Sequence, residues 1–158
     1  MTENYLQVLE ESLRKKLTIL DQLREYSRLQ QEVFQSDVPD LEQYDSYVDA
    51  KDKLIDEIIM LDNGFEILYA NVSQELKDNR DKYRDQIRIL QDLVRKVTEE
   101  SVALQTQEER NKTLVENFFR GQRTAIGQGR KSSRAAYGYY KNMSNAGVET
   151  SQFLDSKK

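Results

Sequence analysis

Three apolar seams, whose residues recur at alternating spacings of three and four, constrain the fold more than any other feature of the sequence. Such spacing places one stripe of each helix against its neighbours and is typical of coiled-coil-like packing. The longest seam predicts a helix over about 79–126. Its positions are Tyr83, Ile87, Leu90, Val94, Val97, Ser101, Leu104, Glu108, Asn111, Val115 and Phe118.

The other two seams predict helices over about 3–35 and 40–76. The first is Leu6, Leu9, Leu13, Leu17, Leu20, Leu23 and Phe34, and it weakens near Ser27 and Gln30. The second is Leu41, Tyr44, Val48, Lys51, Ile55, Ile58, Asp62, Phe65, Tyr69, Val72 and Leu76, with two polar interruptions. Its register continues through Gly64, so we expect one continuous helix there, weakened by about 1 kcal/mol relative to alanine. Pro39 separates the two helices.

The predicted fold class is all-α: an elongated antiparallel bundle of about three long helices with coiled-coil-like packing and a flexible C-terminal tail. At 1.5 Å per residue the helices would be about 50, 55 and 70 Å long. The third would be longer than its neighbours, so we expect its C-terminal end to overhang or bend. The predicted domains are a bundle over 1–126 and a tail over 127–158.

The charge of the predicted tail is opposite to that of the bundle. Residues 127–158 hold six Lys/Arg and two Asp/Glu, whereas residues 1–126 hold 18 and 26. The net charge of −4 therefore conceals an acidic body and a basic tail, which would attract each other within a screening length of about 10 Å at 0.1 M salt. Without sustained periodicity the tail is expected to be disordered alone.

The sequence offers little material for catalysis. It has no histidine and no cysteine, which removes imidazole bases, thiol chemistry and the usual soft metal ligands. We interpret the carboxylates at Glu99-Glu100 and Glu108-Glu109 as solvated helix faces. We therefore expect a protein that is not an enzyme and has no cofactor or metal. No apolar run is long enough to span a membrane, and no signal peptide is recognisable, so a cytoplasmic location is expected.

Two groups of residues are candidates for partner binding. The first is the cluster Leu114, Val115, Phe118 and Phe119, with Ile126 beyond it. These residues either cap the bundle core or, if the third helix overhangs, form an uncovered stripe for a partner helix. The second group lies in the tail and comprises Tyr137, Tyr139, Tyr140, Phe153 and Leu154. Its aromatic content favours a recognition segment over an inert tail.

Two other functions remain open at this level. The polar interval between Glu99 and Lys112 could belong to a structural or scaffold protein that self-associates through its seams, with Val94 and Val97 at the contact. The tail sequence GRKSSRAAYGYYK interleaves basic and aromatic residues and could bind nucleic acid, although the acidic body would repel phosphates. The seams fit both a monomer and a homodimer.

Three segments resemble a known family. LEQYDSYVDAKDKLIDEIIMLD is similar to the second helix of FlgN-type flagellar export chaperones, and ALQTQEERNKTLVENFF, with Asn111 and Leu114, to their third. SQFLDSKK resembles the ending of members from Gram-positive bacteria. Gly64 and the tyrosine-rich tail depart from the pattern, and a FliT-like chaperone is an alternative.

The resemblance implies a cytosolic chaperone of type III flagellar export. Such proteins bind the C-terminal helices of hook–filament junction proteins, prevent premature assembly and deliver them to the export gate or ATPase components. The family's cargo site lies in its C-terminal part. Carried onto this chain, it implies Leu114, Val115, Phe118 and Phe119, with Ile126 and the tail tyrosines as a second contact.

Overall fold

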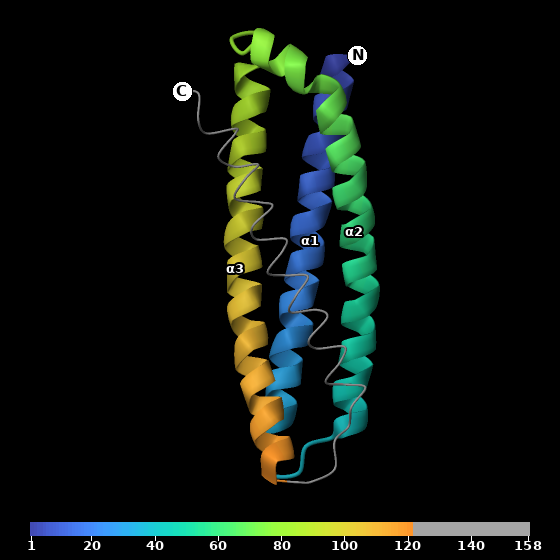
Figure 1. The fold of residues 1–158 in the computed structure, drawn as a ribbon, viewed down its shortest axis with the longest axis vertical. Coiled ribbons are helices and arrows are strands. Elements are labelled where there is room, and N and C mark those ends of the chain that lie inside the picture. The colour runs from blue at the N-terminus through green and yellow to red at the C-terminus, as the bar shows by residue number, and fades with distance from the viewer. Residues whose placement is uncertain (122–158) are drawn as a thin grey trace.

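The computed structural model describes residues 1–121, which form three long helices (Figure 1). They are α1 (Thr2–Gln35), α2 (Leu41–Asp78) and α3 (Arg84–Gly121). The described part contains no strand, so the predicted all-α bundle is confirmed. The first two helices agree with prediction to within two residues at each end. The third begins five residues later than predicted, and its predicted end at Ile126 and the tail over 127–158 lie outside the described residues.

Helix α1 is the central element of the bundle. It packs against both α2 and α3 along their lengths, and it lies between them in Figure 1. Within the described helices, no Cα atom of α2 lies within 8 Å of a Cα atom of α3. The two outer helices are therefore held together by α1 and by side chains that reach across it.

The predicted seams form the core. Most seam positions are buried, and the fully buried large side chains include Leu9, Leu20, Leu23, Ile58 and Leu104. At an apolar transfer free energy of about 25 cal/mol per Å², each such side chain stabilises the fold by about 1.5–3 kcal/mol. Helix α2 continues through Gly64, as its unbroken seam predicts.

The expected overhang of the third helix is wrong for the described residues. α2 and α3 have 38 residues each, because residues 79–83 form the turn between them rather than the first turn of α3. Near the end of α3, Val115 is covered, because it packs with Val33 of α1 and with Tyr44 and Val48 of α2. The sequence predicted a third helix longer than the other two, whereas the three described helices are of similar length.

Side-chain contacts fix the two turns. The Asp40 carboxylate accepts a hydrogen bond of 3.1 Å from the Gln43 amide and caps α2. At the other turn the Tyr83 hydroxyl donates to Glu75 at 3.0 Å. Thr2 also donates to Glu75, and these hydrogen bonds hold the pKa of that carboxyl below its usual value. Glu75 thereby links the start of α1, the end of α2 and the turn.

Replacing Asp40 by alanine removes the helix cap and leaves an amide of the first turn of α2 without its side-chain acceptor. We expect Asp40→Ala to lower the free energy of unfolding by about 1 kcal/mol. Urea denaturation followed by circular dichroism measures the change. Asp37→Ala, in the same loop, is the matched control and should change the stability by less than about 0.5 kcal/mol. Equal losses in both variants would contradict the capping role.

Candidate functional site

The predicted partner-binding residues of α3 lie at the end of the bundle where α1 finishes and α2 begins. Val115 is 4% exposed and faces the other helices, whereas Leu114, Phe118 and Phe119 are half-buried. The structure therefore brings the four predicted residues of α3 together. It divides them into one interior residue and three that keep part of their surface accessible.

Aromatic rings join the three helices at this end. The ring of Phe34 in α1 meets Tyr44 of α2 at 5.1 Å and Phe118 of α3 at 5.5 Å, both edge to face. Phe118 and Phe119 meet at 5.1 Å. Such pairs contribute about 0.5–1.5 kcal/mol each beyond their buried area. We call Leu114, Phe118, Phe119 and their ring partner Phe34 the end cluster.

The remaining predicted site residues fall outside residues 1–121. They are Ile126, Tyr137, Tyr139, Tyr140, Phe153 and Leu154. The basic and aromatic stretch considered for nucleic-acid binding lies outside the described residues as well. Their roles stay predictions.

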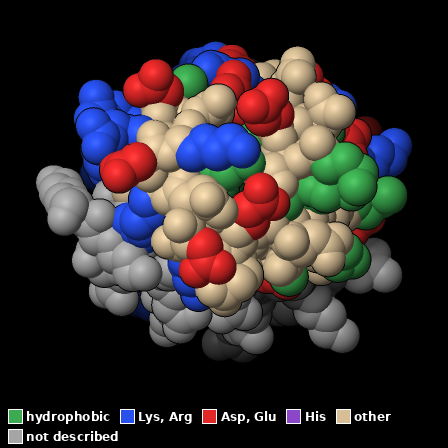
Figure 2. Space-filling model, turned by 90° about the horizontal axis from the view of Figure 1, so that it is seen from above, with side chains coloured by type: hydrophobic (Ala, Val, Ile, Leu, Met, Phe, Trp, Pro, Cys, Tyr) green, Lys and Arg blue, Asp and Glu red, His purple; other side chains and the backbone are tan. Residues whose placement is uncertain are grey.

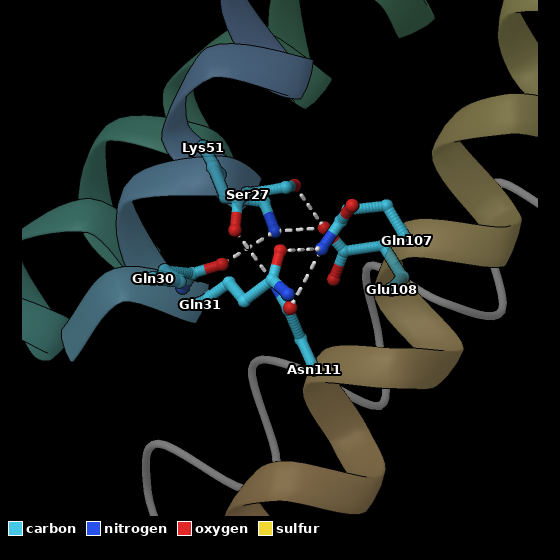
Figure 3. A network of polar contacts seen from close by, with 7 residues as sticks. All are labelled: Ser27, Gln30, Gln31, Lys51, Gln107, Glu108 and Asn111. Atoms are coloured by element: carbon cyan, nitrogen blue, oxygen red, sulfur yellow. Dashed lines mark hydrogen bonds and ion pairs between the residues drawn. The ribbon is translucent and has the colours of Figure 1, made fainter. Parts of the chain in front are cut away.

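Buried polar side chains from all three helices contact one another (Figure 3). On α3 they lie at Glu108 and Asn111, just before Leu114 of the end cluster. Lys51 of α2 pairs with Glu108 of α3, and its ammonium also donates to the side-chain oxygen of Gln30 in α1 at 2.9 Å. The hydroxyl of Ser27 donates to Glu108, and the Asn111 amide donates to the Ser27 carbonyl at 2.8 Å. We call these five residues the polar layer.

The charges of the polar layer are removed from water. The side chains of Lys51 and Glu108 are only 4% and 3% exposed. Burial lowers the pKa of the Lys51 ammonium from its usual 10.5, although the neighbouring carboxylate of Glu108 acts in the opposite direction. Loss of hydration therefore outweighs the attraction of the partner, and either charge alone at this position would be strongly unfavourable.

The interpretation of Glu108 as part of a solvated face is wrong. Its position in the seam of α3 was a signal that it faces the bundle. Lys51 and Asn111 are equally distant along the chain from Asp81 in the turn, so an antiparallel hairpin brings them to one level. Matching the seam interruptions across the hairpin could have predicted the layer.

The other polar position in the seam of α2 is also paired. The Lys16 ammonium of α1 contacts the Asp62 carboxylate at 2.6 Å, with side chains 12% and 31% exposed. Both polar residues in the α2 seam, Lys51 and Asp62, therefore form an ion pair with a side chain of another helix.

Residues 1–121 contain no group of three or more potential ligands placed to hold a metal ion. No helix among them has the length and apolar character needed to cross a membrane. Neither the comparison with protein-family models nor that with curated proteins finds a match to the chain.

Removing one partner of the Lys51–Glu108 pair should destabilise the fold more than replacing both partners with apolar side chains. Glu108→Ala leaves the Lys51 ammonium buried without its partner, and we expect a loss of about 3–5 kcal/mol in the free energy of unfolding. The double variant Lys51→Met with Glu108→Leu should recover at least half of that loss, because no buried charge remains. Urea denaturation measures both.

Arg14→Ala is the control, since it removes an exposed ion pair with Glu10 and should change stability by less than about 1 kcal/mol. A double variant no more stable than Glu108→Ala would contradict the assignment of the loss to an uncompensated charge.

The lowered pKa of Lys51 should appear in the pH dependence of stability. Between its folded and unfolded pKa values the unfolded chain binds more protons than the folded protein, so this group makes stability rise with pH up to about 10.5. Lys51→Met lacks the group. The stability difference between the unmodified protein and Lys51→Met should therefore widen between pH 8 and pH 10 in urea titrations. A constant difference would show that the ammonium titrates normally.

Proposed function

We propose that the chain is a protein-binding module that acts as a cytosolic export chaperone of the FlgN type rather than as an enzyme. It would bind the C-terminal helices of hook–filament junction proteins and deliver them to the export gate or ATPase components. Two observations support the proposal: the resemblance of the three segments described above, and the half-exposed apolar end cluster. The end cluster carries it, because it contains the α3 residues to which the resemblance assigns cargo binding and keeps part of their surface accessible.

The end cluster is suited to a helix with an apolar stripe. Leu114 and Phe118 are one turn apart on α3 and keep part of their surface accessible, with Phe119 beside them. A partner helix that covers these side chains would bury its own stripe against them, as in other helix-in-groove contacts. The ring of Phe34 contacts that of Phe118 and restricts its motion before a partner binds. Less side-chain entropy would therefore be lost on binding.

Such a contact has the properties that a handover requires. The cargo helices of the proposed partners assemble through apolar stripes, and covering a stripe keeps the cargo monomeric. The three half-exposed side chains form a small contact. Small interfaces are typical of weak, transient complexes, which release their partner readily.

Self-association through the seams is less well supported by the geometry. Val94 and Val97, the proposed contact of a coiled-coil dimer, are buried in the core of the chain itself. In the polar interval before Lys112, the seam residues Glu108 and Asn111 are likewise buried, as part of the polar layer within the chain. Polar substitutions at Val94 and Val97 would therefore unfold the bundle rather than separate two copies.

The proposal is tested by mixing the full chain with purified C-terminal segments of hook–filament junction proteins from the same organism. We expect a complex in size-exclusion chromatography and a dissociation constant in the micromolar range or below by calorimetry. Phe118→Ala combined with Phe119→Ala should weaken binding at least tenfold, since half-exposed anchors of this kind cost about 1–2 kcal/mol or more when truncated.

Because both phenylalanines also contact the bundle, the loss of binding must be separated from a loss of stability. Val33→Ala provides the control: it removes volume from the same end of the core but leaves the half-exposed rings in place. We expect it to lower the unfolding temperature while binding stays within about twofold. Absence of any complex with the unmodified chain would refute the chaperone function, and full binding by the double variant would refute the site.

A further inference from the structure

A groove between α1 and α2 lies on the other half of the rod from the end cluster. It consists of two adjoining hollows that share Lys15, Met60 and Leu61. One hollow reaches Val8 at the start of α1, and the other reaches Gln22. At 1.5 Å per residue this stretch of α1 is about 21 Å long, enough for about four turns of a partner helix.

The α2 side of the groove exposes apolar side chains. Met60, which lines both hollows, is 75% exposed. Ile67, two turns further along α2 and outside the lining of the hollows, is 68% exposed. Val8 of α1 is 50% exposed on the opposite wall. Seen from the end at which α1 begins, apolar side chains gather on the side of the molecule where α2 lies (Figure 2). Large apolar side chains exposed together mark interaction surfaces more often than scattered single ones do.

Gly64 lines the groove between these side chains. An interior helical glycine lowers helix stability relative to alanine. No described residue places an atom within 4 Å of the position that a Cβ on Gly64 would occupy, so packing within the described bundle does not require the glycine. Its effect on the surface is to deepen the groove, so that a side chain from outside can approach the helix backbone.

The charges around the groove indicate what could fill it. On α2 the charged lining residue is Glu57, which is exposed, and from Leu54 to Leu76 the sequence contains no Lys or Arg. Glu11 of α1 lies on the opposite wall, where Lys15 is the basic lining residue. The surroundings are therefore more acidic than basic, which complements a partner that carries Lys or Arg beside its apolar stripe.

The same charges disfavour a second copy of the chain. Two copies that met through this face would bring their acidic side chains towards one another. A stable dimer also needs about 800 Å² of buried surface from each partner, and the exposed large apolar side chains of α2 are Ile59, Met60 and Ile67. One helix lying in the groove uses the available surface without that repulsion.

We propose that the α1–α2 groove is a second docking site, and that it binds an amphipathic helix whose apolar stripe is flanked by Lys or Arg. Met60 and Val8 contact the stripe, and Gly64 admits a large apolar side chain of the partner. Glu57 on one wall and Glu11 on the other pair with its basic flanks. The site does not depend on the chaperone function or on the end cluster.

The test uses the full chain and a labelled 18-residue helical peptide that carries leucine on one face and lysine on both flanks. Fluorescence anisotropy at low salt should give saturable binding. Gly64→Gln fills the groove and replaces a glycine in the middle of a helix, so it should weaken binding at least tenfold while the unfolding temperature rises by about 2–4 °C. Loss of binding then has no explanation in misfolding.

Two controls make the result specific. Ala70→Gln enlarges an exposed small residue of the same helix that does not line the groove, and its affinity should stay within twofold of the unmodified chain. A peptide with glutamate in place of lysine should bind at least tenfold more weakly.

Three results would overturn the proposal. They are absence of peptide binding, equal binding by Gly64→Gln, and equal binding of the glutamate peptide. A concentration-dependent dimer that Gly64→Gln abolishes in sedimentation, without peptide binding, would overturn it too and assign the groove to a second copy.

Discussion

The ion pair between Lys51 and Glu108 joins the two outer helices of the bundle across the helix that both of them pack against. Each charge has lost nearly all of its hydration, and each depends on the other for compensation. Gln30, Ser27 and Asn111 supply further hydrogen bonds, so that the pair is embedded in a satisfied network. The position of α3 relative to α2 therefore depends on one set of polar contacts as well as on the apolar seams.

A purely apolar seam would constrain the three helices less. Leucine and valine side chains can pack in several registers with similar energies, whereas a buried charge is tolerated only where its partner lies. A shift of α3 by one turn along α1 would separate Glu108 from Lys51 and leave both charges without a counter-charge. The polar layer is therefore expected to favour this register, and the more exposed pair between Lys16 and Asp62 to add a weaker preference between α1 and α2.

Much of this architecture could be predicted from spacing alone. The seams of all three helices identified most of the core, including the polar positions Ser101 and Asn111, because a heptad position faces its neighbours whatever side chain it carries. They omitted Ile19, Val33 and Leu93, which are buried as well. What spacing could not supply was the start of α3. The turn at 79–83 has no proline or glycine to mark it, and its hydrogen bonds continue the helical direction from Asn79 to Ile87. The overhang, which the described residues 1–121 do not show, was expected because of this misplaced start.

The candidate sites were harder to predict for a different reason. Whether Phe118 is accessible depends on how far α1 and α2 extend beside it, which is a property of the packed bundle and not of the α3 sequence. Glu108 was misassigned because the density of carboxylates in its segment concealed its seam position. The exposed Met60 and Ile67 lie off the seam, and they become visible as a surface only when the orientation of α2 is known.

The central place of α1 also has a consequence for synthesis of the chain on the ribosome. α1 and α2 can pair as soon as both have emerged, but Glu108 follows Lys51 by 57 residues. At a synthesis rate of about 5–20 residues per second, Glu108 is added to the chain about 3–11 s after Lys51. During that interval the α1–α2 hairpin contains Gln30, which accepts a hydrogen bond from the Lys51 ammonium, but not the carboxylate of Glu108 that balances its charge. Until α3 has been made, burying this ammonium against an apolar surface would cost free energy that no carboxylate compensates, which disfavours closing the seam on an apolar neighbour.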